Sequence, residues 1–195
     1  MQTNDFPIFP LRVVLYPGGP LPLRIFEPRY VDMVSHCMRN ASCFGVVGVH
    51  EDSQEGSSRV FGVGTAARIV DWDMGDDGLL SIRTLGEQRF RIESMGKKTD
   101  GLDLACVSWL EPEPVIAVPE SLAYLSGVVM SLLEEFEQLY GDIPRQPKNA
   151  GWLGYRLAEL LPLSIAQKQL YLELEDPVAR LQQLARDVSQ LRSDA

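Results

Sequence analysis

The chain lacks several features that would place it in a familiar class. It contains no run of about 18 apolar residues, so the sequence predicts no membrane-spanning helix. Its N-terminus, MQTNDFPIFP, has neither the basic region nor the apolar stretch of a secretion signal, which favours a cytoplasmic location. Its 18 basic and 27 acidic residues give a net charge of -9, which repels a phosphate backbone and disfavours nucleic-acid binding.

Cysteine and histidine are also scarce. The cysteines are Cys37, Cys43 and Cys106, and the odd number does not form a disulfide framework. His36 and His50 lie near two of them, but no Cys-x-x-Cys pair is present. We therefore interpret the cysteines as small apolar residues of the core and predict no metal and no cofactor.

An acidic stretch, DWDMGDDG, partly resembles a calcium-binding loop. Asp71 and Asp73 occupy the first two ligand positions, but Asp76 stands where the loop needs glycine, and Ile82 where it needs glutamate. We interpret this stretch as the solvated tip of a hairpin.

Catalytic motifs are missing too. The sequence has no Gly-x-Ser-x-Gly, and Gly96-Lys97-Lys98-Thr99 lacks the upstream glycine of a phosphate-binding loop, since Arg91 stands there. Ser164 and Lys168 are spaced like a Ser-Lys dyad, but Ser164 with Gln167 three residues later is typical of a capping box at a helix start. The sequence therefore predicts that the protein is not an enzyme.

The pattern of apolar residues changes near position 115. Before it, the residues alternate, as in QRFRIE with Phe90 and Ile92, which indicates strands. The alternation slips where Val107 follows Cys106, which suggests a bulge. Asp-Gly pairs mark turns, and the polar stretch 50–58 is expected to be an exposed loop. This pattern predicts a β-rich domain 1–115.

After that position the chain is predicted to be helical, as a domain 116–195. One helix is expected over residues 119–141, with an apolar stripe formed by Leu122, Leu125, Val129, Leu132, Phe136 and Leu139. A second runs through Leu153 and Leu157 and ends before Pro162. Two more begin at the Ser164 cap and at Asp176-Pro177.

The N-terminal stretch YPGGPLPLRIFEPRY combines prolines and glycines with residues of the buried type. We expect strands over residues 9–15 and 21–26, a rigid turn over 16–20, and a helix beginning at Pro28. The rigid corner could present a preorganised apolar surface. The candidate polypeptide-binding residues are Tyr16, Leu21, Leu23, Phe26 and Tyr30. The alternative is that these residues belong to the core.

This corner, PIFPLRVVLYPGGPLPLRIFEPRY, resembles the start of the N-terminal domain of Lon proteases. FGVVGV, VGTAARIVD, GEQRFRI and LPLSIAQKQLYLELEDPVARLQQL resemble later segments of that domain, in the same order. The resemblance implies an α+β fold: an N-terminal β-rich PUA-like pseudo-barrel with one or two helices, followed by a C-terminal α-helical bundle. Because the chain stops at Ala195, where a Lon protease would continue into its ATPase, it looks like a free-standing substrate-binding domain. Part of cereblon is similar as well.

Three functions follow as hypotheses. The first is a non-catalytic module whose partners are unfolded or degradation-marked polypeptides or a partner protease. The second is RNA binding, because PUA-like folds elsewhere bind RNA and Arg83, Arg89 and Arg91 could line one sheet face; solvated strand arginines are the alternative. The third is a peptidase, for which the sequence offers no catalytic residues. Self-association into a homo-oligomer is left open.

Overall fold

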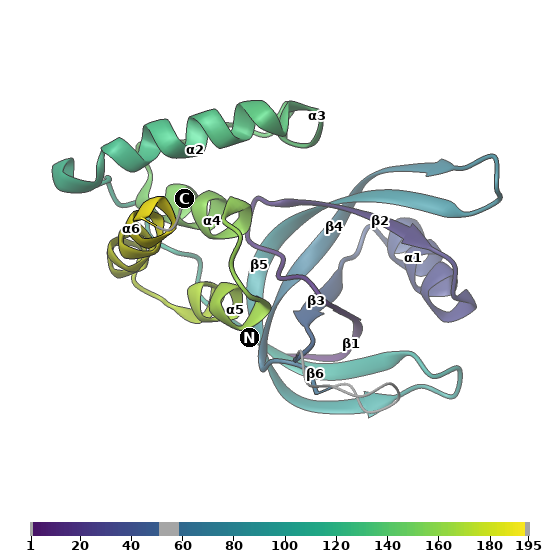
Figure 1. Ribbon diagram of the computed structural model, residues 1–195. Coiled ribbons are helices and arrows are strands. Elements are labelled where there is room, and N and C mark those ends of the chain that lie inside the picture. Colours follow the sequence, from purple (N-terminus) through teal and green to yellow (C-terminus); the bar gives the residue numbers. More distant parts are fainter. Residues whose placement is uncertain (1, 51–58, 194–195) are drawn as a thin grey trace. The chain divides into compact units, whose positions relative to one another are not determined.

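The protein combines a β-rich part with a helical part, which confirms the predicted α+β class. The computed structural model describes residues 2–50 and 59–193 (Figure 1). It divides into two compact units, Met1–Glu111 and Pro112–Ala195, and each is treated by itself below. The stretch 50–58 was predicted to be an exposed loop, and its residues 51–58 lie outside the described residues. Within the described ranges, no helix is long and apolar enough to cross a bilayer.

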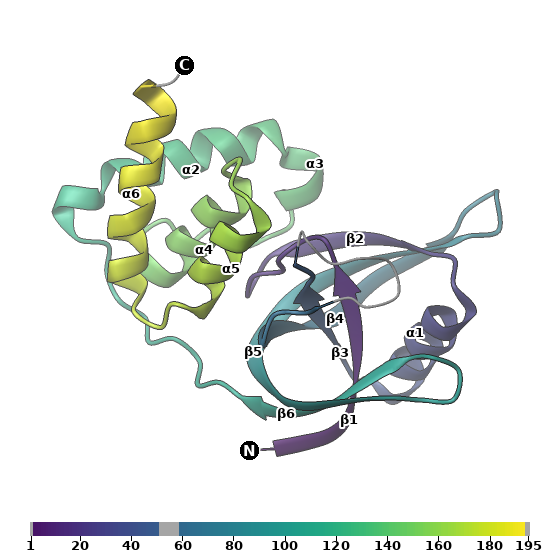
Figure 2. The same cartoon turned by 60° about the horizontal axis from the view of Figure 1, so that its bottom comes forward.

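The first unit is a sheet that closes on itself. Its strands are β1 (Gln2–Leu11), β2 (Pro20–Ile25), β3 (Phe44–Gly48), β4 (Val63–Met74), β5 (Leu80–Lys97) and β6 (Asp103–Trp109). Their order is β2-β5-β4-β3-β1-β6, and β6 also pairs with β5. Figure 2 shows how the long β5 curves, so that its first half pairs with β2 and its second half with β6. All pairs are antiparallel except β1 with β3.

The first strand differs from its predicted position. It begins at Gln2 and ends at Leu11, whereas residues 9–15 were expected to form it. It tolerates Pro7 and Pro10 because β6 pairs with its residues up to Ile8 and β3 with those from Ile8 onward, so each proline has a paired strand on one side only.

Two apolar clusters lie on opposite faces of the sheet. Neighbouring residues of one strand fall into different clusters, as Val46 and Val47 do, because side chains alternate along a strand. Helix α1 (Pro28–Asn40) contributes to one cluster through Tyr30, Met33 and Val34. The other cluster centres on Phe90, which is fully buried.

Two glycines make room for the ring of Phe90. A Cβ atom on Gly45 would lie 2.6 Å from Phe90 Cζ, and one on Gly64 would lie 2.7 Å from it and 2.5 Å from the carbonyl oxygen of Val46. Both separations are far below van der Waals contact. Any side chain at these positions would therefore push Phe90 or the adjacent strand away.

The bulge predicted in β6 lies instead in its partner strand. Ala105 and Val107 are both buried in one cluster, so β6 keeps a regular alternation through Cys106. The register shifts in β5, between Ile92 and Ser94. The apparent slip arose because Leu102 and Leu104 belong to the cluster on the other face, so both faces of this segment carry apolar residues.

The second unit is helical. Its elements are η1 (Glu120–Leu122), α2 (Tyr124–Glu135), α3 (Glu137–Tyr140), α4 (Ala150–Leu160), α5 (Ile165–Glu173) and α6 (Pro177–Ser193). Helix α4 contacts α2, α5 and α6 and carries a long run of buried residues. The cap predicted at Ser164 is confirmed: its Oγ accepts the Gln167 N–H at 3.2 Å, and the Gln167 side chain accepts the Ser164 N–H at 3.1 Å.

The helix predicted over residues 119–141 is not continuous. A 3-10 turn precedes α2, and the chain breaks at Phe136, which has φ -112° and ψ 30°. The buried side follows Leu125, Val129 and Leu133, whereas Phe136 is largely exposed. The predicted stripe follows the buried side through Leu125 and Val129 and ends with α2, because Phe136 is not helical and the residues after it no longer share one helix face.

Candidate functional site

The five candidate binding residues do not form one exposed rim. Tyr16 and Tyr30 are buried, and the Tyr30 ring stacks on Phe9 with 3.9 Å between ring centroids. Leu21 and Leu23 are half-buried and pack against the core cluster on the α1 side of the sheet. Phe26 is the member that solvent reaches freely, with 71% of its surface exposed.

An exposed apolar surface does occur beside these residues, on strands β2, β5 and β4. Cross-strand partners point to the same face of a sheet. Leu23, Ile82 and Trp72 form one such row across the three strands, and Ile25, Leu80 and Met74 form the next. The central residues of both rows are buried, while Trp72 and Met74 are each 55% exposed. We call Leu23, Trp72 and Met74, together with Phe26 just beyond the end of β2, the sheet-face patch.

This patch continues the core that α1 covers. Ile25, Leu80 and Ile82 belong to the same cluster as the buried residues of α1, so the helix covers part of this face and leaves the β4 end of each row open. Phe26 directly follows Ile25 at the end of β2. Figure 1 shows α1 beside the end of β2, with the β4–β5 hairpin extending past it.

Acidic side chains fix the hairpin that carries Trp72 and Met74. Asp77 accepts a hydrogen bond from Arg24 of β2 and, through Oδ1, another from the Leu79 N–H at 3.1 Å. Gly78 provides the positive φ of 75° that the turn requires. The Asp71 carboxylate lies 3.9 Å from the guanidinium of Arg83. The Arg24–Asp77 contact therefore joins the hairpin turn to β2, while the Asp71–Arg83 pair lies between the two strands of the hairpin. No group of three or more metal ligands occurs in residues 2–50 and 59–193.

The three arginines of β5 differ in their surroundings. Arg89 is buried, Arg83 lies near the Asp71 carboxylate, and Arg91 is exposed. Arg83 and Arg91 are eight residues apart on β5, so they form no continuous basic patch, and the net charge of -9 further weakens any attraction for a polyanion.

In the second unit, the residues spaced like a Ser-Lys dyad have other partners. Ser164 forms the helix cap, and Lys168 Nζ donates to the backbone carbonyl of Glu159 at 2.8 Å. Burial lowers the pKa of Lys168 and raises that of Glu159, whose side chain is 13% exposed. The Arg156 Nε lies 3.1 Å from the Glu159 carboxylate, though at an angle outside hydrogen-bond geometry. The opposite charges of Arg156 and Glu159 therefore compensate one another inside the helical unit.

A second buried ion pair joins the segment before η1 to α6. Arg180 Nη1 donates to Glu113 Oε2 at 3.0 Å, Nη2 donates to Oε1 at 2.5 Å, and Nε donates to the Tyr171 carbonyl at 2.8 Å. The Tyr155 hydroxyl donates to the same carboxylate. Arg180 is completely buried, which makes this contact a structural anchor.

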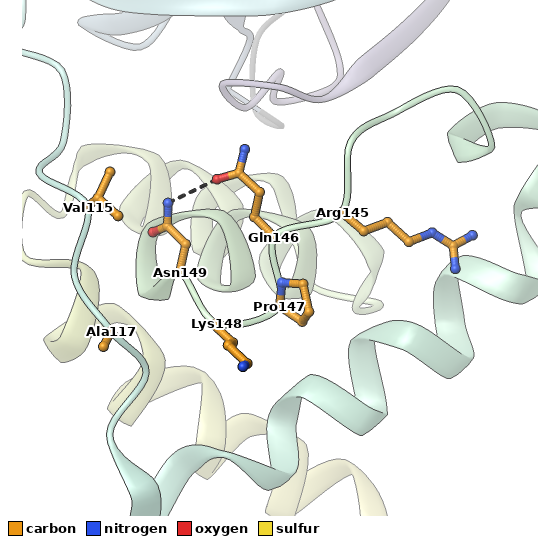
Figure 3. Close-up of a pocket in the computed structure, with 7 residues that line it drawn as sticks. All are labelled: Val115, Ala117, Arg145, Gln146, Pro147, Lys148 and Asn149. Carbon is orange, nitrogen blue, oxygen red and sulfur yellow. Dashed lines mark hydrogen bonds between the residues drawn. The ribbon is translucent and has the colours of Figure 1, made fainter.

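A cleft of about 580 Å³ opens beside that segment (Figure 3). The residues that line it are Val115, Ala117, Arg145, Gln146, Pro147, Lys148 and Asn149. The Asn149 side chain donates to Gln146 Oε1 at 3.2 Å across its floor. None of these residues was singled out from the sequence.

Comparison with known proteins accounts for nearly the whole chain. Residues 5–188 match the family described as the ATP-dependent protease La (LON) substrate-binding domain. The chain belongs to this family. Lon protease 2 of Myxococcus xanthus is 29% identical over 185 residues, which cover 90% of this chain and 22% of that protein. Cereblon of Danio rerio is 29% identical over 122 residues, or 60% of this chain and 28% of that protein. The chain thus spans about a quarter of these relatives.

A solved structure agrees in fold as well. The Lon N-terminal domain protein from Xanthomonas campestris aligns with a TM-score of 0.79 and 36% identity, covering 94% of this chain and 98% of that one. The resemblance predicted from the sequence motifs is thereby confirmed.

Trp72 and Met74 were not among the residues predicted from the sequence. In the stretch IVDWDM, apolar Val70, Trp72 and Met74 alternate with Asp71 and Asp73. That period of two would have indicated an apolar face opposite the acidic one. The prediction for this stretch was a solvated hairpin tip, which considered only the aspartates.

Proposed function

We propose that the protein is a non-catalytic module that binds unfolded or degradation-marked polypeptides, either alone or on behalf of a partner protease. The observation that carries the proposal is the sheet-face patch, in a chain that belongs to a substrate-binding family. Trp72, Met74 and Phe26 are mostly exposed on one end of a rigid sheet. Aromatic and methionine side chains are enriched where proteins recognise apolar segments.

The rigidity of the patch supports this function. The Arg24–Asp77 contact and the ladder between β4 and β5 hold Trp72 and Met74 in place before a ligand arrives. Less conformational entropy is therefore lost on binding than with a loop. The closed ring of strands is consistent with the narrower proposal of a PUA-like domain near residues 1–115, and the packing of α4 on three other helices with a helical bundle near 116–195.

Fluorescence anisotropy with labelled casein, an unfolded protein, tests the binding surface. We expect casein to bind, and Phe26→Ser and Trp72→Ser to weaken binding by about tenfold each, since burying an aromatic ring contributes about 1.5–3 kcal/mol. Tyr124→Ser and Phe136→Ser are matched controls, because both rings are exposed to a similar degree on the helical unit. Circular dichroism shows whether each variant is folded.

Two results would count against the proposal. Equal binding of casein and of a folded protein of similar charge would remove the preference for unfolded chains. Loss of binding in the Tyr124 and Phe136 variants, with no effect at Phe26 and Trp72, would place the surface elsewhere. Incubating casein with the protein, with and without ATP, tests the non-catalytic part, and we expect the casein to stay intact.

A further inference from the structure

A short extended segment in the helical unit has the geometry of an edge strand. The Val118 N–H donates to the Lys148 carbonyl at 3.0 Å, and the Ala150 N–H donates to the Ile116 carbonyl at 2.8 Å. These two bonds form a single antiparallel bridge. Residues 115–118 are thus held against the chain that leads into α4.

The other edge of this segment is open within the part of the chain that the structure describes. Backbone groups alternate in direction along an extended chain, so those of Val115 and Ala117 point away from the bridge. No hydrogen bond to the backbone N–H or C=O of either residue is found among the described residues. Pro119, the next residue with the same direction as Val115 and Ala117, has no N–H, so the donors of the open edge end at Ala117.

The side chains beside this edge form the cleft of Figure 3. Val115, which is 85% exposed, and Ala117 lie along one wall, with Asn149 and Pro147 on the facing loop. A strand paired to the open edge would place every second side chain on the face where Val115 and Ala117 project. The cleft can therefore receive such a side chain.

The charge at the cleft indicates which side chain fits. Arg145 is paired with Glu137, with 2.7 Å between Nη2 and Oε2. Lys148 lines the same cleft, and no ion pair involves it in the described ranges. An aspartate or glutamate would complement its ammonium group.

We propose that this edge binds an extended polypeptide by strand addition, with an acidic side chain of that polypeptide in the cleft beside Lys148. The added strand would form backbone hydrogen bonds with Val115 and Ala117. This is a second site, on the helical unit, and it does not depend on the sheet-face patch.

Backbone methylation of a probe peptide tests strand pairing directly. The probe is a fluorescein-labelled peptide of alternating valine and glutamate, titrated with the whole chain by anisotropy. In one analogue the valine amides are N-methylated, and in the other the glutamate amides. We expect one analogue to bind at least about tenfold more weakly and the other to bind like the parent, because only alternate amides face the edge. Equal affinities of the two analogues, or no binding of the parent, would overturn the proposal.

Variants of the protein test the location. Ala117→Pro removes a backbone N–H that donates no hydrogen bond among the described residues. We expect this variant to bind the probe peptide at least about tenfold more weakly. Lys148→Glu should weaken binding most at low salt, and a valine–lysine peptide should bind Lys148→Glu better than the parent protein. Leu170→Ser changes an exposed apolar residue of α5 that belongs to neither proposed site, and it should leave probe binding unchanged. A folded Ala117→Pro protein that binds normally, or an equal loss caused by Leu170→Ser, would refute the assignment.

Discussion

The Glu113–Arg180 pair allows a quantitative test of what anchors the segment before η1. We consider Glu113→Ala. The Arg180 side chain is 0% exposed and that of Glu113 10%, and both carboxylate oxygens accept from the guanidinium. The substitution leaves the Arg180 charge buried, with the carbonyls of Tyr171 and Leu174 and the Tyr155 hydroxyl as its acceptors.

The expected cost follows from that burial. Removing one partner of a buried ion pair destabilises a protein by about 3–5 kcal/mol, because the remaining charge is not compensated. This is a large share of the about 5–15 kcal/mol that stabilises a typical domain. Replacing both partners, as in Glu113→Ala with Arg180→Met, should recover much of the loss, because no buried charge remains.

Urea denaturation of the parent, both single variants and the double variant measures this coupling. Hydrogen exchange with mass spectrometry then locates the effect, which should fall on peptides from α4 to α6 and spare β1 to β6. A cost of Glu113→Ala below about 1 kcal/mol would refute the reasoning. So would a double variant whose loss equals the sum of the single losses, since the two groups would then act independently.

Three further predictions concern packing, capping and reactivity. Gly64→Ala should lower the free energy of unfolding, measured by urea denaturation, by about 1–3 kcal/mol or more, because its Cβ would overlap the neighbouring strand. Gly127→Ala, which has open space around it in α2, should instead raise it by about 0.5–1 kcal/mol. Equal changes in the free energy of unfolding for the two variants would contradict the packing described. Ser164→Ala should lower stability by about 1 kcal/mol through loss of the cap, and an unchanged urea midpoint would argue against it. Burial, and then the Glu87 carboxylate, raises the pKa of Cys43 to about 11, so its thiolate fraction at pH 8 should be about 100-fold below that of a thiol with the ordinary value of 9.0. Iodoacetamide labelling should therefore accelerate up to about pH 11 and be faster at pH 8 in Glu87→Gln; labelling that levels off near pH 9 would contradict the raised pKa.

Local signals predicted much of the structure because they depend on neighbouring residues. The Ser164 cap, the helix starts at Pro28 and Pro177, and the strand after Pro20 all follow from backbone chemistry within a few residues. The break at Phe136 was missed because no proline or glycine marks it, so nothing in the neighbouring residues signals a helix end there.

The candidate site was harder to predict because exposure is not encoded locally. Tyr16 and Phe26 are both aromatic residues with prolines nearby in the sequence. Tyr16 is nevertheless buried, whereas Phe26 is 71% exposed. The difference depends on which strands lie next to β2 and on how far α1 reaches across the sheet, and neither follows from the corner itself.

The sequence by itself determined the α+β class, the family and the helix starts at Pro28, Ile165 and Pro177, since periodicity, caps and ordered motifs are properties of short stretches. Only the tertiary structure decided that β5 closes a ring with β6, that Trp72 and Met74 extend an apolar face, and that the edge at Ala117 is open. These features arise from pairings between residues far apart in the chain. Many arrangements of paired strands are compatible with the same alternation of apolar residues, and the packing of the core selects one of them.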